Sequence, residues 1–264
     1  MAKQLMIYES AVPVSQGRHG KWAIEVGSDF GFSRAINSVP LTAVEFPSAA
    51  SEYVIIFAGT GDVVTPAVLL GVRDEENLYL AQDGRWKARY VPAFLRRYPF
   101  VFSSRDEGKT FTLCIDESYP GFNRDNVGRK LYEDDKPSQY TQNVLKFLQQ
   151  YQLEFQRTQA FCTKLRELNL LEPMRAQISL ESGERIALGG FMAVDRARLK
   201  TLPSEKLAEL VKSDEMELIF AHLQSMRNFA GMRERLAATV PVTAVAGDAV
   251  PEPGEARAAT AAQS

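Results

Sequence analysis

The feature that most constrains the fold is a set of apolar residues recurring at three- and four-residue steps between Tyr140 and Leu168. This spacing places the side chains in one stripe along an α-helix. Pro137 is well placed for the first turn of that helix. A helix of about thirty residues, at ~1.5 Å each, is roughly 45 Å long, and at that length we expect a bend or a break.

The chain before this helix is rich in strand patterns. Short apolar runs with β-branched residues are typical of buried strands, and they occur at residues 53–57, 67–72 and 77–81. Asp83-Gly84 predicts a hairpin turn, and residues 106–109 predict a second one between strands at 100–103 and 110–115. Short strands joined by tight turns predict a largely antiparallel sheet in the N-terminal half.

The chain after the long helix contains one more hairpin signal and two helix starts. Ser182-Gly183 separates strand patterns at 178–180 and 185–188, and Ser204 and Ser213 are candidate N-caps. Helices plus a β-hairpin in the C-terminal half, after the sheet, predict an α+β fold. We assign residues 1–238 to a single domain. The Ala/Pro-rich residues 239–264 lack aromatics, and we expect a disordered tail there.

Charge and composition narrow the possible partners and location. The formal net charge is -2, from 31 basic and 33 acidic residues, which argues against a nucleic-acid partner. The N-terminus has no apolar segment of a secretory signal, and apolar runs fall short of the ~20 residues of a membrane span. Cys114 and Cys162 lie far apart and are interpreted as reduced thiols. We therefore expect a cytoplasmic protein with no membrane span.

Metal and cofactor chemistry has little support in the histidine content. His19 and His222 are the two histidines of the chain, too few for a His-rich zinc site. Two histidines and one carboxylate could still meet in space. His222 falls on the apolar face of its helix and is interpreted as a hydrogen-bonded core residue, whereas His19 is expected in an exposed turn. No metal site and no cofactor is predicted.

Other motifs also favour structural roles. Gly59-Thr60-Gly61 is a lone Gly-x-Gly and predicts a plain turn; the chain has no phosphate-binding loop and no nucleophile elbow. Asp116 and Glu117 follow Cys114 closely, and negative charge raises a thiol pKa, so Cys114 is interpreted as structural. Residues 133–135 are acidic and favour a helix N-terminus, with a cation site as the alternative. No catalytic residue is identified, and we lean against an enzyme.

Arginines and aromatic residues interleave between residues 83 and 100. Such mixtures are enriched at recognition surfaces, and paired guanidinium groups can grip a carboxylate. The alternative is that these arginines pair with Asp116 and Glu117 and hold strands together. The candidate binding residues are Trp86, Arg89, Tyr90, Arg96, Arg97, Tyr98, Asp116, Glu117 and His222.

The order of motifs along the chain resembles one known family. The matching landmarks are residues 37–41, 45–46, 53–57, 69–71, 76–79, 83–86, 90–100, 114–117, 189–195 and 221–226. They are similar to the SapC family of bacterial proteins, named for a member linked to surface-layer (S-layer) export. The resemblance covers about residues 5–233; it departs at Tyr53-Val54, where the family pattern has Tyr-Pro.

The resemblance implies an accessory role at the bacterial envelope, because relatives are encoded beside TonB-dependent receptors, halogenase-like proteins and cupin-like proteins. One hypothesis is a non-catalytic cytosolic binding protein for surface-protein export or TonB-dependent nutrient uptake, with a protein partner and, as a further candidate, a peptide or small-molecule ligand. The alternative is a peptide- or metabolite-modifying enzyme, or enzyme subunit, working with such halogenase-like or cupin-like partners. Its residues would be His222, Asp116, Glu117 and Arg96, converging on one pocket.

Overall fold

The structure, a computed structural model, describes residues 7–60, 63–104, 110–179 and 183–239. It confirms the α+β prediction: helices and strands are both extensive, and every strand pairing among the described residues is antiparallel. Residues 240–264, which hold nearly all of the predicted tail, lie outside the described residues.

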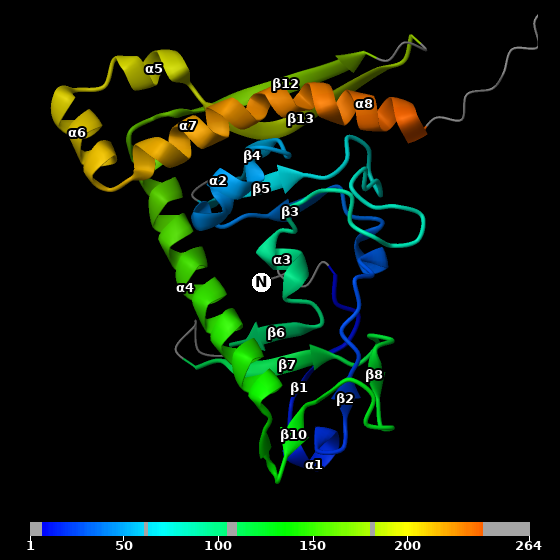
Figure 1. The fold of residues 1–264 in the computed structure, drawn as a ribbon. Helices are drawn as coiled ribbons and strands as arrows, with labels where there is room; N and C mark the ends of the chain where they lie inside the picture. Colours follow the sequence, from blue (N-terminus) through cyan, green and yellow to red (C-terminus); the bar gives the residue numbers. More distant parts are fainter. Residues whose placement is uncertain (1–6, 61–62, 105–109, 180–182, 240–264) are drawn as a thin grey trace, which may run out of the picture.

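A five-stranded sheet with order β12-β13-β4-β5-β3 forms the larger half of the fold. Its strands are β3 (Ser38–Pro40), β4 (Ile55–Thr60), β5 (Val63–Leu69), β12 (Leu171–Ser179) and β13 (Arg185–Val194). The helices α7 (Glu215–Ser225) and α8 (Phe229–Thr239) run alongside β12 and β13 (Figure 1). Ile55 and Phe57 are fully buried, as their continuous apolar run predicts.

Smaller sheets form the other half of the fold around a second hydrophobic cluster. One has the order β1-β7-β6, another β8-β2-β9, and β10 pairs with β11. Ile24, Phe100, Ile115, Leu131 and Leu148 are the buried residues of this cluster. The strands are β1 (Ala11–Pro13), β2 (Ala23–Ile24), β6 (Phe100–Ser103), β7 (Thr112–Asp116), β8 (Phe122–Asn123), β9 (Arg129–Lys130), β10 (Tyr132–Glu133) and β11 (Lys136–Pro137).

The long helix α4 (Gln139–Glu167) passes along both halves of the fold (Figure 1). It runs without a break, so the predicted break is absent, and the alternative, a bend, stays a prediction. Its N-cap is Ser138, whose Oγ accepts the backbone N–H of Thr141 at 3.2 Å, so Pro137 lies just before the helix and not in its first turn. Phe147 packs against both hydrophobic clusters and therefore lies where the two halves meet.

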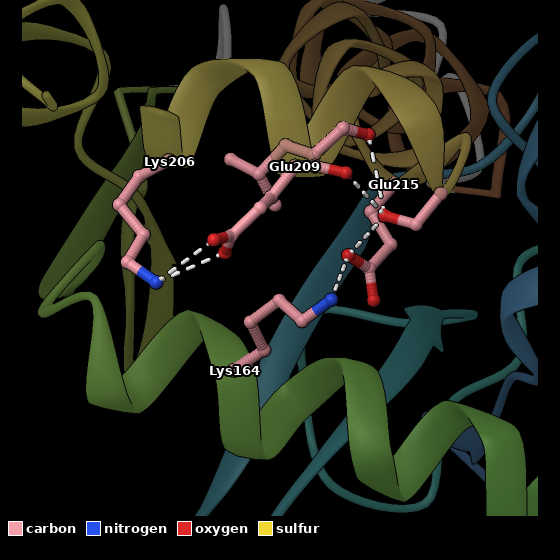
Figure 2. A network of polar contacts seen from close by, with 6 residues as sticks. Lys164, Lys206, Glu209 and Glu215 are labelled. Carbon is pink, nitrogen blue, oxygen red and sulfur yellow. Dashed lines mark hydrogen bonds and ion pairs between the residues drawn. The ribbon is translucent and has the colours of Figure 1, made fainter. Parts of the chain in front are cut away.

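Polar contacts join the C-terminal end of α4 to the corner between α6 (Ser204–Lys212) and α7 (Figure 2). Lys164 bonds to Glu215, and the Ser213 hydroxyl donates to Glu215 at 2.6 Å. Pro203 is the N-cap of α6, Ser213 its C-cap, and Asp214 is the N-cap of α7. The predicted N-caps Ser204 and Ser213 are therefore wrong by one residue each: Ser204 is the first residue of α6, and Ser213 ends α6 one residue before the N-cap of α7.

Several predicted strands shift or disappear. The hairpins β6–β7 and β12–β13 are confirmed, although the β6–β7 turn and three residues of the β12–β13 connection lie outside the described residues. Residues 77–81 form no strand; Leu80 makes only an isolated bridge with Trp86. The predicted turn at Gly84 is present, with φ 82°, but the residues on either side of it form only isolated bridges and not a hairpin of paired strands. The strand expected at 67–72 is β5, which ends at Leu69.

The remaining short elements position the loops discussed below. They are α1 (Gln16–His19), η2 (Gly31–Ser33), η3 (Ala43–Glu45), α2 (Phe46–Ala49), α3 (Ala93–Arg96), α5 (Arg196–Lys200) and η4 (Met226–Asn228). Within the part of the chain that the structure describes, no helix combines the length and apolar character that a membrane crossing requires.

Candidate ligand-binding cleft

Trp86 belongs to the packing of the fold. Its indole N–H lies 2.8 Å from the Tyr53 hydroxyl and 3.1 Å from the Tyr90 carbonyl oxygen, and its ring stacks on Tyr79. Tyr53 also donates to the Tyr90 carbonyl. These contacts fix the loop that leads to α3, so Trp86 shapes the neighbouring surface without forming part of the cleft.

Glu45 is the buried acceptor that holds this loop and α3 in place. It accepts the Tyr90 hydroxyl and the backbone N–H of Ala93, both at 2.7 Å, and the N–H and hydroxyl of Thr42 at 2.9 and 2.7 Å. Burial, followed by the negative charge of Glu45, raises the pKa of Tyr90 far above its usual value. Tyr90 is therefore a neutral hydrogen-bond donor in the folded chain.

Arg96, Arg97 and Tyr98 line a cleft of about 260 Å³. Phe147 also lines it, so the cleft opens where the two hydrophobic clusters meet. Its other lining residues are Ile24, Val26, Gly27, Asp29, Phe30, Phe32, Leu95, Pro99, Phe100, Tyr119, Tyr140 and Val144.

Seven of the sixteen lining residues of the cleft are aromatic, and several of their rings contact one another. Tyr98 stacks on Phe32 and meets Tyr119 edge-on with ring centroids 5.6 Å apart. Phe100 and Tyr140 meet edge-on at 6.0 Å. Burial, with the charge of Asp116 as the next cause, raises the pKa of Tyr98 to about 12, so the Tyr98 phenol is uncharged at neutral pH.

The two arginines of the cleft differ in exposure. Arg97 is 4% exposed and lies over Phe94 at 4.3 Å and Tyr151 at 5.1 Å. Arg96 is exposed, lies 5.5 Å from the Phe147 ring centroid, and donates its Nε–H to the Val91 carbonyl at 3.0 Å. Because Arg96 is held at the rim with donors left facing solvent, it can bind an incoming carboxylate, whereas Arg97 supports the wall.

The predicted binding residues Asp116 and Glu117 do not line the cleft. Asp116 is fully buried and accepts the backbone N–H groups of Glu9 at 2.7 Å and Ser10 at 3.1 Å, and the Ser118 hydroxyl at 2.8 Å. It thereby holds the N-terminal segment beside β7. The alternative prediction is that arginines between residues 83 and 100 form ion pairs with Asp116 and Glu117. The described contacts of Asp116 do not support it.

Glu117 pairs with Arg18 and with His19, whose Nε2 lies 2.9 Å away. Burial raises the pKa of Glu117, but the hydrogen bonds from His19 and Arg18 outweigh it and leave that pKa below its usual value. His19 is fully buried, so the expectation of an exposed turn residue is wrong. Its Nδ1 accepts the Ser15 N–H at 3.1 Å, which leaves the proton on Nε2 for Glu117.

His222 is a core histidine, as its place on an apolar helix face predicts. It is fully buried; its Nε2 accepts the Val194 N–H and its Nδ1 donates to the Ile55 carbonyl, both at 3.0 Å. Burial lowers the pKa of His222 to about 4. Because His222 bonds strands of the five-stranded sheet while Asp116 belongs to the β1-β7-β6 sheet, the structure does not bring the predicted enzymatic constellation together.

The remaining candidates also resolve into structural roles. Both cysteines are buried, and burial raises the pKa of Cys162 to about 12. Asp134 and Asp135, with φ of 47° and 61°, form the turn between β10 and β11, not the first turn of α4. No group of three metal-binding side chains occurs among the residues described. Arg89 lies outside the cleft, in a separate cavity.

Sequence patterns missed several cleft residues. Tyr140 and Phe147 belong to the apolar stripe of α4, but their place in a cleft depends on how the helix packs. Asp29, Phe32 and Tyr119 lie in segments without a period or a motif. Their clustering with Tyr98 arises from contacts between distant parts of the chain, which no local pattern encodes.

Comparison with known proteins places the chain in a family. No curated protein and no solved structure matches it. The family profile described as SapC matches residues 14–232, which is most of the sequence and includes all the cleft residues named above. The chain therefore belongs to the SapC family.

Proposed function

We propose that this chain is an accessory binding protein of a bacterial cell-envelope system, acting in the cytoplasm in surface-protein export or TonB-dependent nutrient uptake. It binds a protein partner through the aromatic cleft. The observation that carries the binding role is the cleft itself, which the aromatic rings of Tyr98, Phe32, Tyr119 and Tyr140 line beside the exposed Arg96. The envelope role follows from the resemblance to the family.

The size of the cleft favours one side chain of a partner over a whole small molecule. Its volume of about 260 Å³ lies just below the range of roughly 300–1,000 Å³ that is typical of small-molecule pockets. Aromatic pockets that exclude water are the usual positions of binding hot spots between proteins. We therefore expect an aromatic or large apolar side chain to insert there.

The rim of the cleft supplies the expected charge preference. Arg96 is exposed, and its Cζ lies over the rings of Tyr90 and Phe147, 5.7 and 5.5 Å from their centroids. A guanidinium held in this way binds a carboxylate with little further loss of side-chain freedom. We expect an acidic residue of the partner close to the inserted side chain.

Val26 offers a clean test, because it lines the cleft and is 62% exposed. Val26→Glu places a negative charge at the mouth of the cleft without disturbing buried packing. Val44 is also 62% exposed and does not line the cleft, so Val44→Glu is the matched control. Trp86→Ala is a poor probe because Trp86 packs within the fold.

The experiment is affinity capture from the native cell with the wild-type chain, Val26→Glu, Arg96→Gln and Val44→Glu. We expect the wild type and Val44→Glu to retain one envelope or uptake component, and Val26→Glu and Arg96→Gln to lose it. Equal retention by Val26→Glu would show that the cleft is not the binding surface. Capture of a partner unrelated to the envelope would overturn the envelope role and leave the cleft assignment standing.

A further inference from the structure

A second cavity, of about 410 Å³, lies apart from the aromatic cleft. Three separate segments form it: the turn after α2, the loop before α3, and the chain from η4 into α8. Its lining residues are Ser51, Glu52, Arg89, Asn228, Gly231 and Arg235, none of which lines the cleft.

Arg235 is a fixed positive charge in this cavity. Its guanidinium lies 4.4 Å from the centroid of the Tyr79 ring, and Tyr79 in turn packs against Tyr53 with centroids 4.6 Å apart. Burial raises the pKa of Tyr79 to about 12, so the phenol is neutral at physiological pH and does not offset the charge of Arg235. A cation placed on a neutral ring keeps its planar set of donors in one orientation.

Arg89 is the second positive charge, and its backbone is fixed. The N–H of Arg89 lies 3.0 and 2.9 Å from the two carboxylate oxygens of Glu52. The side chain is exposed, and no ion pair to its guanidinium occurs within the described ranges. The chain therefore holds this cation at the edge of the cavity without using it in the fold.

Glu52 is the one carboxylate among the lining residues, and backbone groups engage it. It accepts the N–H groups of Arg89 and Tyr90, the latter at 3.0 Å, so part of its charge is balanced by their dipoles. Asn228 is fixed as well, because its Nδ2 donates to the carbonyls of Ala50 at 2.8 Å and Tyr53 at 2.7 Å. The cavity therefore contains two guanidinium groups, of Arg89 and Arg235, and one carboxylate, of Glu52, so its net charge is positive.

We infer that this cavity binds the carboxylate or phosphate group of a small polar ligand between Arg89 and Arg235. Its volume lies within the range of ordinary small-molecule sites, and guanidinium groups bind both kinds of oxyanion through paired hydrogen bonds. The site shares no residue with the aromatic cleft, so it stands or fails independently of the proposed binding function.

Titration of the full chain with inorganic phosphate and, separately, with succinate tests this site by calorimetry at low ionic strength. We expect saturable binding of at least one anion, weakened by added NaCl because the contacts are charged. Arg89→Gln should weaken that binding by about tenfold or more, the loss expected for one charge-assisted contact. The anion that binds more tightly identifies a carboxylate or a phosphate ligand.

Arg85→Gln is the matched control, because Arg85 is in the same loop, has a 75% exposed side chain and already pairs with Asp83. It should bind both anions as the wild type does. Arg235→Lys keeps the charge but loses the planar donors, and we expect it to weaken binding while the circular dichroism spectrum stays unchanged. Lack of binding by both anions, or wild-type affinity in Arg89→Gln, would overturn the site.

Discussion

The rings of Tyr98 and Phe32 stack with centroids 4.1 Å apart and an interplanar angle of 27°. Phe32 lies in η2 and Tyr98 just after α3, so the stack joins two loops that are distant in sequence. Tyr98 also contacts Tyr8, with centroids 5.4 Å apart. The shape of the cleft wall therefore depends on the packing of Tyr98 more than on any single element of secondary structure.

Tyr98→Ala should lower the free energy of unfolding by about 2–4 kcal/mol, because it removes a partly buried ring with three aromatic neighbours. Tyr98→Phe keeps the ring and its three aromatic neighbours and loses only the phenol hydroxyl, so we expect a cost of about 1 kcal/mol. Urea denaturation of both variants measures the difference. Equal costs would mean that the hydroxyl, and not the ring stack, stabilises the wall.

Glu45→Ala should be more destabilising, by about 3 kcal/mol or more. It leaves buried donors of Thr42, Tyr90 and Ala93 without their acceptor. Glu45→Gln keeps one carbonyl oxygen on the same side chain and is the matched control, with a smaller expected cost. The measurements are urea denaturation and near-ultraviolet circular dichroism, which reports on the packing of aromatic residues such as Trp86 and Tyr90. A cost below about 1 kcal/mol for Glu45→Ala would contradict this role.

Local patterns predicted the elements that depend on local physics. The apolar stripe of α4 (Gln139–Glu167) and the hairpins β6–β7 and β12–β13 follow from side-chain period and turn residues, and the structure contains them. The structural role of Glu45 could also have been predicted, because Thr42 and Glu45 have the spacing of a capping box. Both hydrogen bonds of that capping box are present.

Positions that depend on distant contacts could not be predicted in this way. His19 is buried because Glu117 and Trp22 cover it, and its own sequence, Gly17 to Gly20, is typical of an exposed turn. Trp86 was expected on a recognition surface, yet the Tyr53 hydroxyl and the Tyr79 ring draw it into the packing. In both cases a contacting residue is distant in the sequence, so the residues next to His19 or Trp86 do not predict the contact.

The two cysteines should be slow to alkylate in the native chain. Burial raises the pKa of Cys114 and raises that of Cys162 to about 12, and the thiolate is the reactive form. We expect iodoacetamide at pH 8 to modify neither thiol readily in the folded protein and to modify both after denaturation in guanidinium chloride. Mass spectrometry distinguishes the two sites. Rapid native modification of Cys162 would contradict its place on the buried face of α4.

His222 should make the fold less stable in mild acid. Its pKa is lowered from 6.5 to about 4 by burial, so between these values the unfolded chain binds a proton that the folded chain does not. This contribution to stability is fully present above pH 6.5 and is lost as the pH falls towards 4. The loss amounts to about 3 kcal/mol over that interval.

Proton NMR of the imidazole signals tests this directly, because the chain has only two histidines and His222→Gln identifies the signal that disappears. We expect the native His222 signal to show a neutral ring down to about pH 4, and the same residue in urea to titrate near 6.5. Urea denaturation from pH 7 to 4.5 should then show a steeper loss of stability in the wild type than in His222→Gln. A native signal titrating near 6.5 would mean that the ring is reached by solvent, and that its bonds to Val194 and Ile55 do not hold it in the core.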